Sequence, residues 1–284
     1  MPAPADRILR ARYREPIRFV DLTERMALKL SAIPEYTARA HFGVWHRRIG
    51  VPDFERLTGV FTPLVHVDLE TTDVRLEPHT TLLVTGESLL ARTVDQTGAT
   101  RHLLREGQHV VRDAQGELVA RARLVNVFTR YDADPARRRV TTFPPELGLG
   151  TTPSRITELP ALESLLPLAR RPDFADATAH AWHYEQTDAN RHVNGMEYLR
   201  VMEAFVADTL HRAGHDVARL VFARARIVYR KPCFSGEGYR CVAWFRSEAP
   251  LVIAGAIVKA DDAPGARPAA AVELTLQQDD SAAR

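Results

Sequence analysis

Residues 185–203, Glu-Gln-Thr-Asp-Ala-Asn-Arg-His-Val-Asn-Gly-Met-Glu-Tyr-Leu-Arg-Val-Met-Glu, place an acid, an amide and an imidazole at alternate positions before an amphipathic segment. These side chains are Asp188, Asn190 and His192. In an extended segment, side chains two positions apart point to the same side, so we expect the three to converge. The helix expected to follow begins near Gly195 and offers free backbone N–H groups at its positive end. This combination indicates chemistry at a polarised carbonyl, such as that of an acyl thioester.

The same loop resembles the D-x-N-x-H-V-N-N-x-x-Y signature of hotdog-fold acyl-ACP and acyl-CoA thioesterases, with Gly195 in place of the second Asn. A second stretch, residues 227–233 (Ile-Val-Tyr-Arg-Lys-Pro-Cys), resembles the L-E-Y-R-R-E-C sequence found a similar distance downstream in plant and bacterial acyl-ACP thioesterases. Cys233 matches the Cys that this family places at its catalytic centre. Pro232 stands where the family has a Glu, so a mechanism that depends on that Glu is not carried over.

Four residues are therefore expected to be catalytic, namely Asp188, Asn190, His192 and Cys233. His192 or Asp188 would act as a base towards water, and Asn190 would orient the water or donate to the oxyanion. Two interpretations of Cys233 stay open, because a Cys at the end of a strand is either a nucleophile or a buried thiol beside the site. We favour water as the nucleophile, with Cys233 lining the site.

Three further residues are expected at the substrate. Asn194 is the natural N-cap of the helix, and Gly195 has no Cβ, so a thioester can approach the backbone closely. Glu203 falls within the apolar stripe that residues 196, 199, 206 and 210 form at steps of three and four. A carboxylate in such a stripe needs a partner or a role. Glu203 is therefore expected either to bond a backbone group or an Arg at the edge of the stripe, or to act beside the reacting centre.

The rest of the chain predicts two similar halves of the α+β class, each with a helix followed by four strands. The helices are expected over residues 22–49, ending at Gly50, and over 195–213. The strands are expected over 61–69, 81–91, 101–112 and 118–131, and then over 177–185, 219–230, 238–246, 251–259 and 269–277. The resemblance implies a tandem double hotdog, each half a long helix wrapped by an antiparallel β-sheet. Its parts are an N-terminal hotdog over 1–131, which provides the acyl pocket and has no D-x-N-x-H sequence, a linker over 132–172, and a C-terminal hotdog over 173–284 with the catalytic loop.

Composition argues against several other classes of protein. The chain has 284 residues and a formal net charge of +2, which is too near zero to indicate nucleic-acid binding. Its two cysteines cannot build a metal cage alone, and no histidine lies in a zinc spacing such as H-E-x-x-H, so we expect no metal or other cofactor. No GxGxxG, P-loop or GxSxG sequence occurs. The N-terminus has no secretory signal and the longest apolar run, residues 251–258, is too short for a bilayer, so the chain is expected to be cytoplasmic with no membrane partner.

These observations favour a thioesterase that hydrolyses acyl thioesters to a free acid and a thiol. The carrier is either acyl carrier protein (ACP) or coenzyme A (CoA), since the basic residues 137–139, 170 and 171 suit either the acidic surface of a carrier protein or a solvated linker. The alternatives are a hotdog acyltransferase, decarboxylase or dehydratase acting on a carrier-bound acyl or polyketide intermediate, and a non-catalytic acyl-binding module. The D-x-N-x-x-H spacing of hotdog hydratases is missing, which argues against hydration. A tandem chain supplies its own hotdog pairing, so it is expected to be a monomer or a homodimer.

Overall fold

The computed structural model describes residues 6–49, 58–130, 132, 134, 137–150, 152–188, 190–263 and 265–278. Its centre is an 11-stranded sheet with the order β1-β4-β5-β6-β3-β10-β13-β12-β11-β8, in which β9 also pairs with β11. The strands before the linker are β1 (Leu9–Pro16), β3 (Leu64–Thr71), β4 (Thr81–Val94), β5 (Thr100–Arg112) and β6 (Leu118–Val127), with a separate pair, β2 (Val60–Phe61) and β7 (Thr129–Arg130). The later strands are β8 (Phe174–Ala175), β9 (His180–Ala181), β10 (Leu220–Tyr229), β11 (Gly238–Glu248), β12 (Leu251–Lys259) and β13 (Ala270–Gln278).

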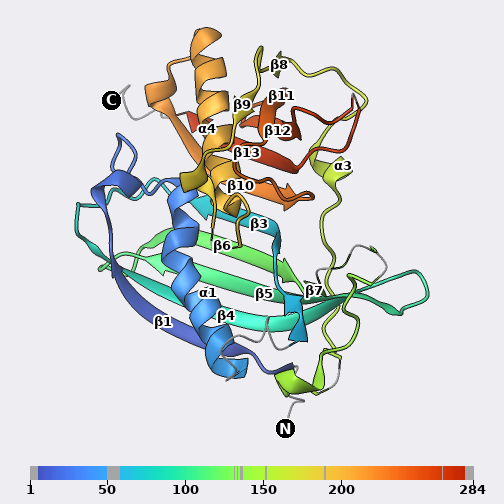
Figure 1. The fold of residues 1–284 in the computed structure, drawn as a ribbon. Coiled ribbons are helices and arrows are strands. Elements are labelled where there is room, and N and C mark those ends of the chain that lie inside the picture. The colour runs from blue at the N-terminus through green and yellow to red at the C-terminus, as the bar shows by residue number, and fades with distance from the viewer. Residues whose placement is uncertain are drawn as a thin grey trace.

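The order of the strands is mirrored on the two sides of the junction between β3 and β10. On one side of this junction β6, β5, β4 and β1 follow β3, and on the other side β13, β12, β11 and β8 follow β10. β3 and β10 pair antiparallel from Glu70 opposite Arg224 to His66 opposite Val228. The two halves of the chain therefore share one continuous sheet, with the first half below and the second above in Figure 1.

Two long helices cover one face of this sheet. The helix α1 (Ile33–Ile49) packs on β4, β1, β6 and β5, and α4 (Gly195–Arg212) packs on β12, β10, β11 and β13. Gly107 of β5 and Gly255 of β12 lie in one cross-strand row, because both connect through paired residues of β6, β3, β10 and β13. A Cβ on Gly107 would meet His41 of α1, and a Cβ on Gly255 would meet Met202 of α4. Both helices therefore lie on the same face, as Figure 1 shows.

The linker packs against the opposite face of the sheet. Leu159 contacts the buried cluster that contains Leu104 and Val125, and the short helix α3 (Leu162–Leu165) packs with Val228 and Trp244. The sequence predicted only an inter-domain linker here, because its scattered charges and prolines show no periodicity. Its leucines instead bury apolar side chains that the two long helices leave uncovered.

The four strands expected after each long helix are present, with ends that differ by a few residues. The first helix begins at Ile33, and not at residue 22, because Pro34 suits the first turn of a helix and lacks the N–H that an interior position would need. The expected helix end at Gly50 and strand end at Tyr131 lie outside the described residues. The strand expected over 177–185 is wrong, since only the short β9 forms there and a 3-10 helix, Tyr184–Gln186, follows it.

The strand β1 was not expected at all. Its sequence, Leu-Arg-Ala-Arg-Tyr-Arg-Glu-Pro, alternates half-buried and exposed residues, which is the signal of an edge strand. The charges that protect this edge from aggregation also concealed the alternation. In the described part of the chain, no helix is long and apolar enough to cross a membrane.

Candidate active site

The expected catalytic loop lies at a cavity of about 570 Å³ between the two halves of the chain. One wall comes from the first half, from residues 61–65 around the start of β3, residue 127 at the end of β6, and residues 129 and 130 of β7. The other wall comes from the second half and holds Asp188, Asn190, His192, Gly195 and the end of β10. The junction of β3 and β10 positions the two walls. Four of the seven expected site residues therefore line one cavity.

The backbone of this loop is a tight turn, and not the extended segment that we expected. The Asp188 N–H donates to the His192 carbonyl at 2.8 Å, and the Arg191 N–H donates to the Asp188 carbonyl at 2.9 Å. Arg191 has a φ of 65°, and Thr187 pairs with Val193 on either side. This is a short hairpin whose last loop residue is left-handed. The convergence of the side chains therefore results from a hairpin, and not from the two-residue period of a strand.

Asp188 and Asn190 are exposed, and His192 is half-buried. Asp188 stabilises the turn, because its Oδ1 accepts the Asn190 N–H at 2.8 Å. The His192 ring packs edge-on against Phe234, with 5.1 Å between ring centroids. No hydrogen bond within the described chain joins the three side chains to one another. They are thus available to a substrate or a water molecule in the cavity.

The start of α4 leaves one backbone donor free at the cavity. Asn194 is the N-cap, as expected, because its Oδ1 accepts the Met196 N–H at 2.9 Å. No described residue accepts a hydrogen bond from the Gly195 N–H, and Gly195 lines the cavity. The Tyr229 hydroxyl donates to the Gly195 carbonyl at 2.8 Å, which ties the first turn of the helix to β10. A free N–H at the positive end of a helix can stabilise an oxyanion.

Cys233 lies behind this wall. The residue is fully buried, and it is not among those that line the cavity. Its N–H donates to the Tyr198 hydroxyl at 3.0 Å, and Tyr198 itself lines the cavity. Burial raises the pKa of the Cys233 thiol, which disfavours the thiolate. The Cys233 backbone lies beside the loop, because its carbonyl accepts the Val193 N–H at 2.8 Å, but its thiol is packed behind the residues that line the cavity.

Glu203 lies away from the cavity, eight residues or about 12 Å along α4 from Gly195. It lines a second cavity, of about 820 Å³, beside Ser31 and Lys29. Burial raises the pKa of Glu203 to about 7, against the opposing effects of a Ser31 hydrogen bond and of the Arg200 and Lys29 charges. The expected role at the reacting centre therefore does not follow from its position.

A polar cluster extends from the cavity into the first half, where the resemblance implied the acyl pocket. The Asn126 side chain donates to the Thr62 carbonyl at 2.8 Å, and Thr62 lines the cavity. Behind Asn126, the fully buried Arg105 donates to the Asn126 Oδ1 at 3.0 Å and contacts His41 Nε2 at 2.8 Å. Burial lowers the pKa of Arg105 to about 9, so it stays cationic at neutral pH. The space between α1 and the sheet is thus lined by polar groups beside Thr62.

Sequence reasoning could not name the residues of the first half that line the cavity, because residues 61–65, 129 and 130 belong to no motif. It also left Tyr198 and Tyr229 without a role. Both tyrosines occur in the two motifs quoted above, so a signal for them was present. Among the described residues, no group of three or more His, Cys, Asp or Glu side chains could hold a metal ion.

No protein-family model matches the chain, and no curated protein matches it. Solved structures do match over nearly its whole length. A protein assigned as an oleoyl thioesterase from Lactobacillus plantarum has a TM-score of 0.69 at 16% identity, covering 96% of this chain and 97% of its own. The chain has a hotdog fold. The 12:0-ACP thioesterase from Umbellularia californica has a TM-score of 0.66 at 14% identity, covering 95% of this chain and 98% of its own.

A MaoC-like dehydratase from Phytophthora capsici has a lower TM-score of 0.53 at 19% identity, covering 95% of this chain and 96% of its own. The hotdog fold is thus shared with enzymes of two reaction classes. The structural resemblance to the acyl-ACP thioesterases confirms the family likeness that the two motifs indicated. At these identities the likeness concerns the fold, and the reaction has to be argued from the site.

Proposed function

We propose that this chain is a thioesterase that hydrolyses acyl thioesters to a free acid and a carrier thiol. The observation that carries this proposal is the meeting of Asp188, Asn190 and His192 with the free Gly195 N–H around one cavity. Hydrolysis of a thioester needs a donor to the carbonyl oxygen and a base for water, and this set contains both.

In the proposed mechanism, the thioester carbonyl accepts a hydrogen bond from the Gly195 N–H at the start of α4. His192 or Asp188 removes a proton from a water molecule, which attacks the carbonyl carbon, and Asn190 orients the water or assists the oxyanion. The carbon–sulfur bond then breaks and releases the carrier as a thiolate. A thiolate is a good leaving group, so little help from a general acid is required. Cys233 takes no covalent part in this scheme, because its thiol is buried and its pKa is raised.

The substrate is an acyl thioester of either ACP or CoA. Four cationic residues line the cavity, together with Asp132 and Asp188, and these cations suit the phosphate that both carriers have next to the pantetheine arm. They are Arg130, Arg138, Arg230 and Lys231. Lys231 also pairs with Asp262 at 2.8 Å, so Arg130 and Arg230 are the stronger candidates for a phosphate contact.

We further propose that the chain consists of two hotdog units, over residues 1–131 and 173–284, joined by the linker 132–172. The mirrored strand order and the 17 and 18 residues of α1 and α4 support this division. Each unit contributes a wall to the cavity, so one chain is enough to complete the site and a monomer is sufficient for activity. The cytoplasmic location expected from the sequence remains part of this proposal.

The test is an assay of thiol release from a panel of acyl-CoA and acyl-ACP substrates, with mass spectrometry of the acyl product. Asp188→Asn keeps an oxygen that can accept the Asn190 N–H, so it removes the carboxylate while it preserves the turn. We expect Asp188→Asn and His192→Ala each to lower kcat by about 100-fold or more. Asp208→Asn and His211→Ala, on the C-terminal part of α4, are the matched controls and are expected to keep wild-type rates.

The acyl product separates the remaining alternatives. A free acid that disappears in the two loop variants supports hydrolysis. A transferred, decarboxylated or dehydrated acyl group would replace the proposal with another reaction of the hotdog fold. Binding of acyl thioesters without any turnover by the wild type would leave a non-catalytic acyl-binding protein.

A further inference from the structure

The loop before α1 repeats the backbone of the catalytic loop, displaced by 165 residues. The Thr23 N–H donates to the Ala27 carbonyl and the Met26 N–H to the Thr23 carbonyl, as Asp188 to His192 and Arg191 to Asp188 do in the second half. Met26 has a φ of 62°, against 65° for Arg191. The six backbone bonds whose donors are residues 21, 22, 23, 26, 29 and 32 all recur with donors 186, 187, 188, 191, 194 and 197.

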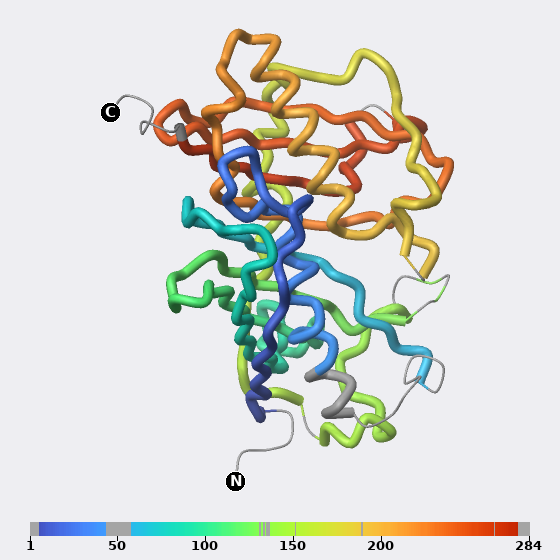
Figure 2. Tube along the Cα trace, turned by 90° about the vertical axis from the view of Figure 1, so that its left-hand side faces the viewer, coloured from blue at the N-terminus to red at the C-terminus, as the bar shows by residue number. Residues whose placement is uncertain are grey.

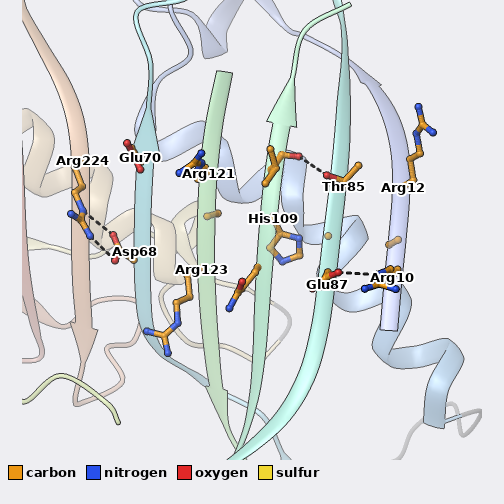
Figure 3. A pocket seen from close by; sticks show the side chains of 15 residues that line it. Arg10, Arg12, Asp68, Glu70, Thr85, Glu87, His109, Arg121, Arg123 and Arg224 are labelled. Carbon is orange, nitrogen blue, oxygen red and sulfur yellow. Dashed lines mark hydrogen bonds and ion pairs between the residues drawn. The ribbon is translucent and has the colours of Figure 1, made fainter. Parts of the chain in front are cut away.

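The flanking elements repeat as well. A 3-10 helix, Phe19–Asp21, precedes the first loop, as Tyr184–Gln186 precedes the second, and Leu22 pairs with Leu28 as Thr187 pairs with Val193. Between residues 18–29 and 183–194 no aligned residue is identical. The repeat therefore lies in the backbone alone. Figure 2 shows the first loop beside the second half, near α4.

The second cavity, which contains Glu203, lies at this repeated loop just as the first cavity lies at the catalytic loop. Thr23, Arg25 and Leu30 line it, at the positions of Asp188, Asn190 and Gly195. Its other wall comes from residues 217, 218 and 220–222, around the start of β10, as residues 61–65 around the start of β3 form a wall of the first cavity. The two cavities are therefore equivalent places in the two halves of the chain.

The chemistry at the repeated positions is different. Asp188, His192 and Gly195 have become Thr23, Ala27 and Leu30, which removes the acid, the base and the site of close backbone approach. Asn190 and Asn194 have become Arg25 and Lys29, so the formal charge over the positions of Asp188, Asn190, His192 and Asn194 changes from −1 to +2. These replacements remove the groups needed for hydrolysis and favour an anionic group.

The remaining charges at the second cavity are largely balanced. Arg18 pairs with Asp21 at 2.7 Å and also with Glu35, and Arg200 pairs with Glu35 at 2.5 Å. The lining holds four cationic and four acidic side chains in total, and Lys29 Nζ also donates to the Val20 carbonyl at 2.8 Å. Glu203 is half-buried, and its pKa of about 7 keeps it mostly protonated at pH 6. The cavity is thus net positive at that pH.

Several residues that line the second cavity are apolar. They are Ala204 and Ala207 of α4, Leu220 and Phe222 of β10, and Val20, which is 68% exposed. Apolar and cationic side chains around one cavity fit a ligand with an aliphatic tail and a single negative head group.

We propose that this second cavity is a non-catalytic binding site for an aliphatic carboxylate, the product class of the reaction assigned to the first cavity. The equivalence of the two loops locates the site, Lys29 selects the negative head, and the α4 alanines admit the chain. The choice of ligand rests on the proposed function, whereas the existence of the site rests on the repeated loop and its cavity.

The test is isothermal titration calorimetry of sodium decanoate into the full chain at pH 6, with decanol as the uncharged probe. The Lys29→Gln variant removes the loop cation whose charge lowers the pKa of Glu203. Ala207→Trp places a large side chain among the apolar residues that line the cavity. We expect Lys29→Gln to weaken decanoate binding about tenfold, and Ala207→Trp to abolish one binding event per chain. Lys259→Gln and Asp208→Trp, which lie outside both cavities, are the matched controls.

Wild-type decanoate binding in both Lys29→Gln and Ala207→Trp would overturn the proposal, as would equally tight binding of decanol. If Ala207→Trp fails to fold, as judged by its Tm, the conservative Lys29→Gln variant alone decides. The readout is independent of catalysis. A wild-type chain that releases no thiol from any thioester would remove the proposed function, while loss of decanoate binding in the variants would still establish the second site.

Discussion

The substitution Gly195→Ala tests the proposed oxyanion donor most directly. A Cβ on Gly195 would lie 3.3 Å from Leu64 Cδ2, 3.3 Å from the Tyr229 hydroxyl oxygen and 3.5 Å from Tyr229 Cζ. Carbon atoms pack best at about 3.5–4.0 Å, so these neighbours would need to move by only a few tenths of an ångström. Ala is also a better helix former than Gly by up to about 1 kcal/mol. We therefore expect the free energy of unfolding to change by less than about 1 kcal/mol.

The effect on activity is expected to be much larger. The added methyl group would lie between Leu64 and Tyr229, where a thioester carbonyl has to approach the Gly195 N–H. Loss of one oxyanion donor lowers kcat by about 10² to 10³, or about 3–4 kcal/mol of transition-state stabilisation. The measurement is kcat/KM for thiol release, with Tm by thermal unfolding on the same samples. We expect kcat/KM to fall by about 100-fold while Tm changes little.

The added methyl group could lower activity by blocking the thioester carbonyl or by displacing the Tyr229 hydroxyl. A double variant separates these two effects. Tyr229→Phe removes the hydroxyl that the new methyl would touch, so Gly195→Ala with Tyr229→Phe relieves that contact. If the methyl blocks the carbonyl, activity stays low in the double variant. A Gly195→Ala protein with wild-type kcat/KM and wild-type Tm would refute the assignment, because the carbonyl would then bind elsewhere.

Three further predictions follow from buried groups. Cys233→Ala should keep kcat within a few-fold of wild type, and the native protein should resist alkylation at Cys233, because the thiol is buried and its pKa is raised. Rapid inactivation by iodoacetamide would show that Cys233 is exposed and needed for activity. Glu203→Gln should stabilise the fold by up to about 3 kcal/mol at pH 8 but not at pH 4, as measured by urea unfolding, since the unfolded state ionises near 4.5 and the folded state near 7. Gly107→Ala should cost about 3 kcal/mol, seen as a lower Tm, because its Cβ would lie 2.2 Å from His41 Nδ1; an unchanged Tm would show that His41 can move aside.

The loop that we propose to be catalytic could be predicted from the sequence, because its proposed chemistry depends on residue types at fixed spacing. Asp188, Asn190, His192 and Gly195 line one cavity, as the motif indicated. The backbone conformation of the loop could not be predicted, because the hairpin depends on a left-handed conformation at Arg191. The sequence does not indicate which non-glycine residue adopts that conformation. The Cys233 backbone bonds to Val193 beside this loop, but whether its thiol faces the cavity depends on packing that the sequence of one strand does not encode.

The repeated loop before α1 shows a different limit. Residues 18–29 and 183–194 share a pattern of backbone hydrogen bonds, but no aligned residue is identical. Sequence comparison of the two segments therefore could not detect the repeat. We also expected a helix in place of this loop, because residues 22–49 are mostly helix-compatible and Thr23 or Asp21 could cap a helix there. Tertiary contacts with α4 and β10 override that local preference.

The pairing of β3 with β10 can hold the two halves of the chain together without the covalent linker between them. Five residue pairs join these strands, and the cavity that holds the proposed catalytic loop is lined by residues from both halves. The halves therefore relate to each other as complementary fragments, and a chain cut between them is expected to reassemble into one complete site. Each fragment alone would expose a long central strand as a free edge, which makes co-expression of both the condition for a soluble split protein.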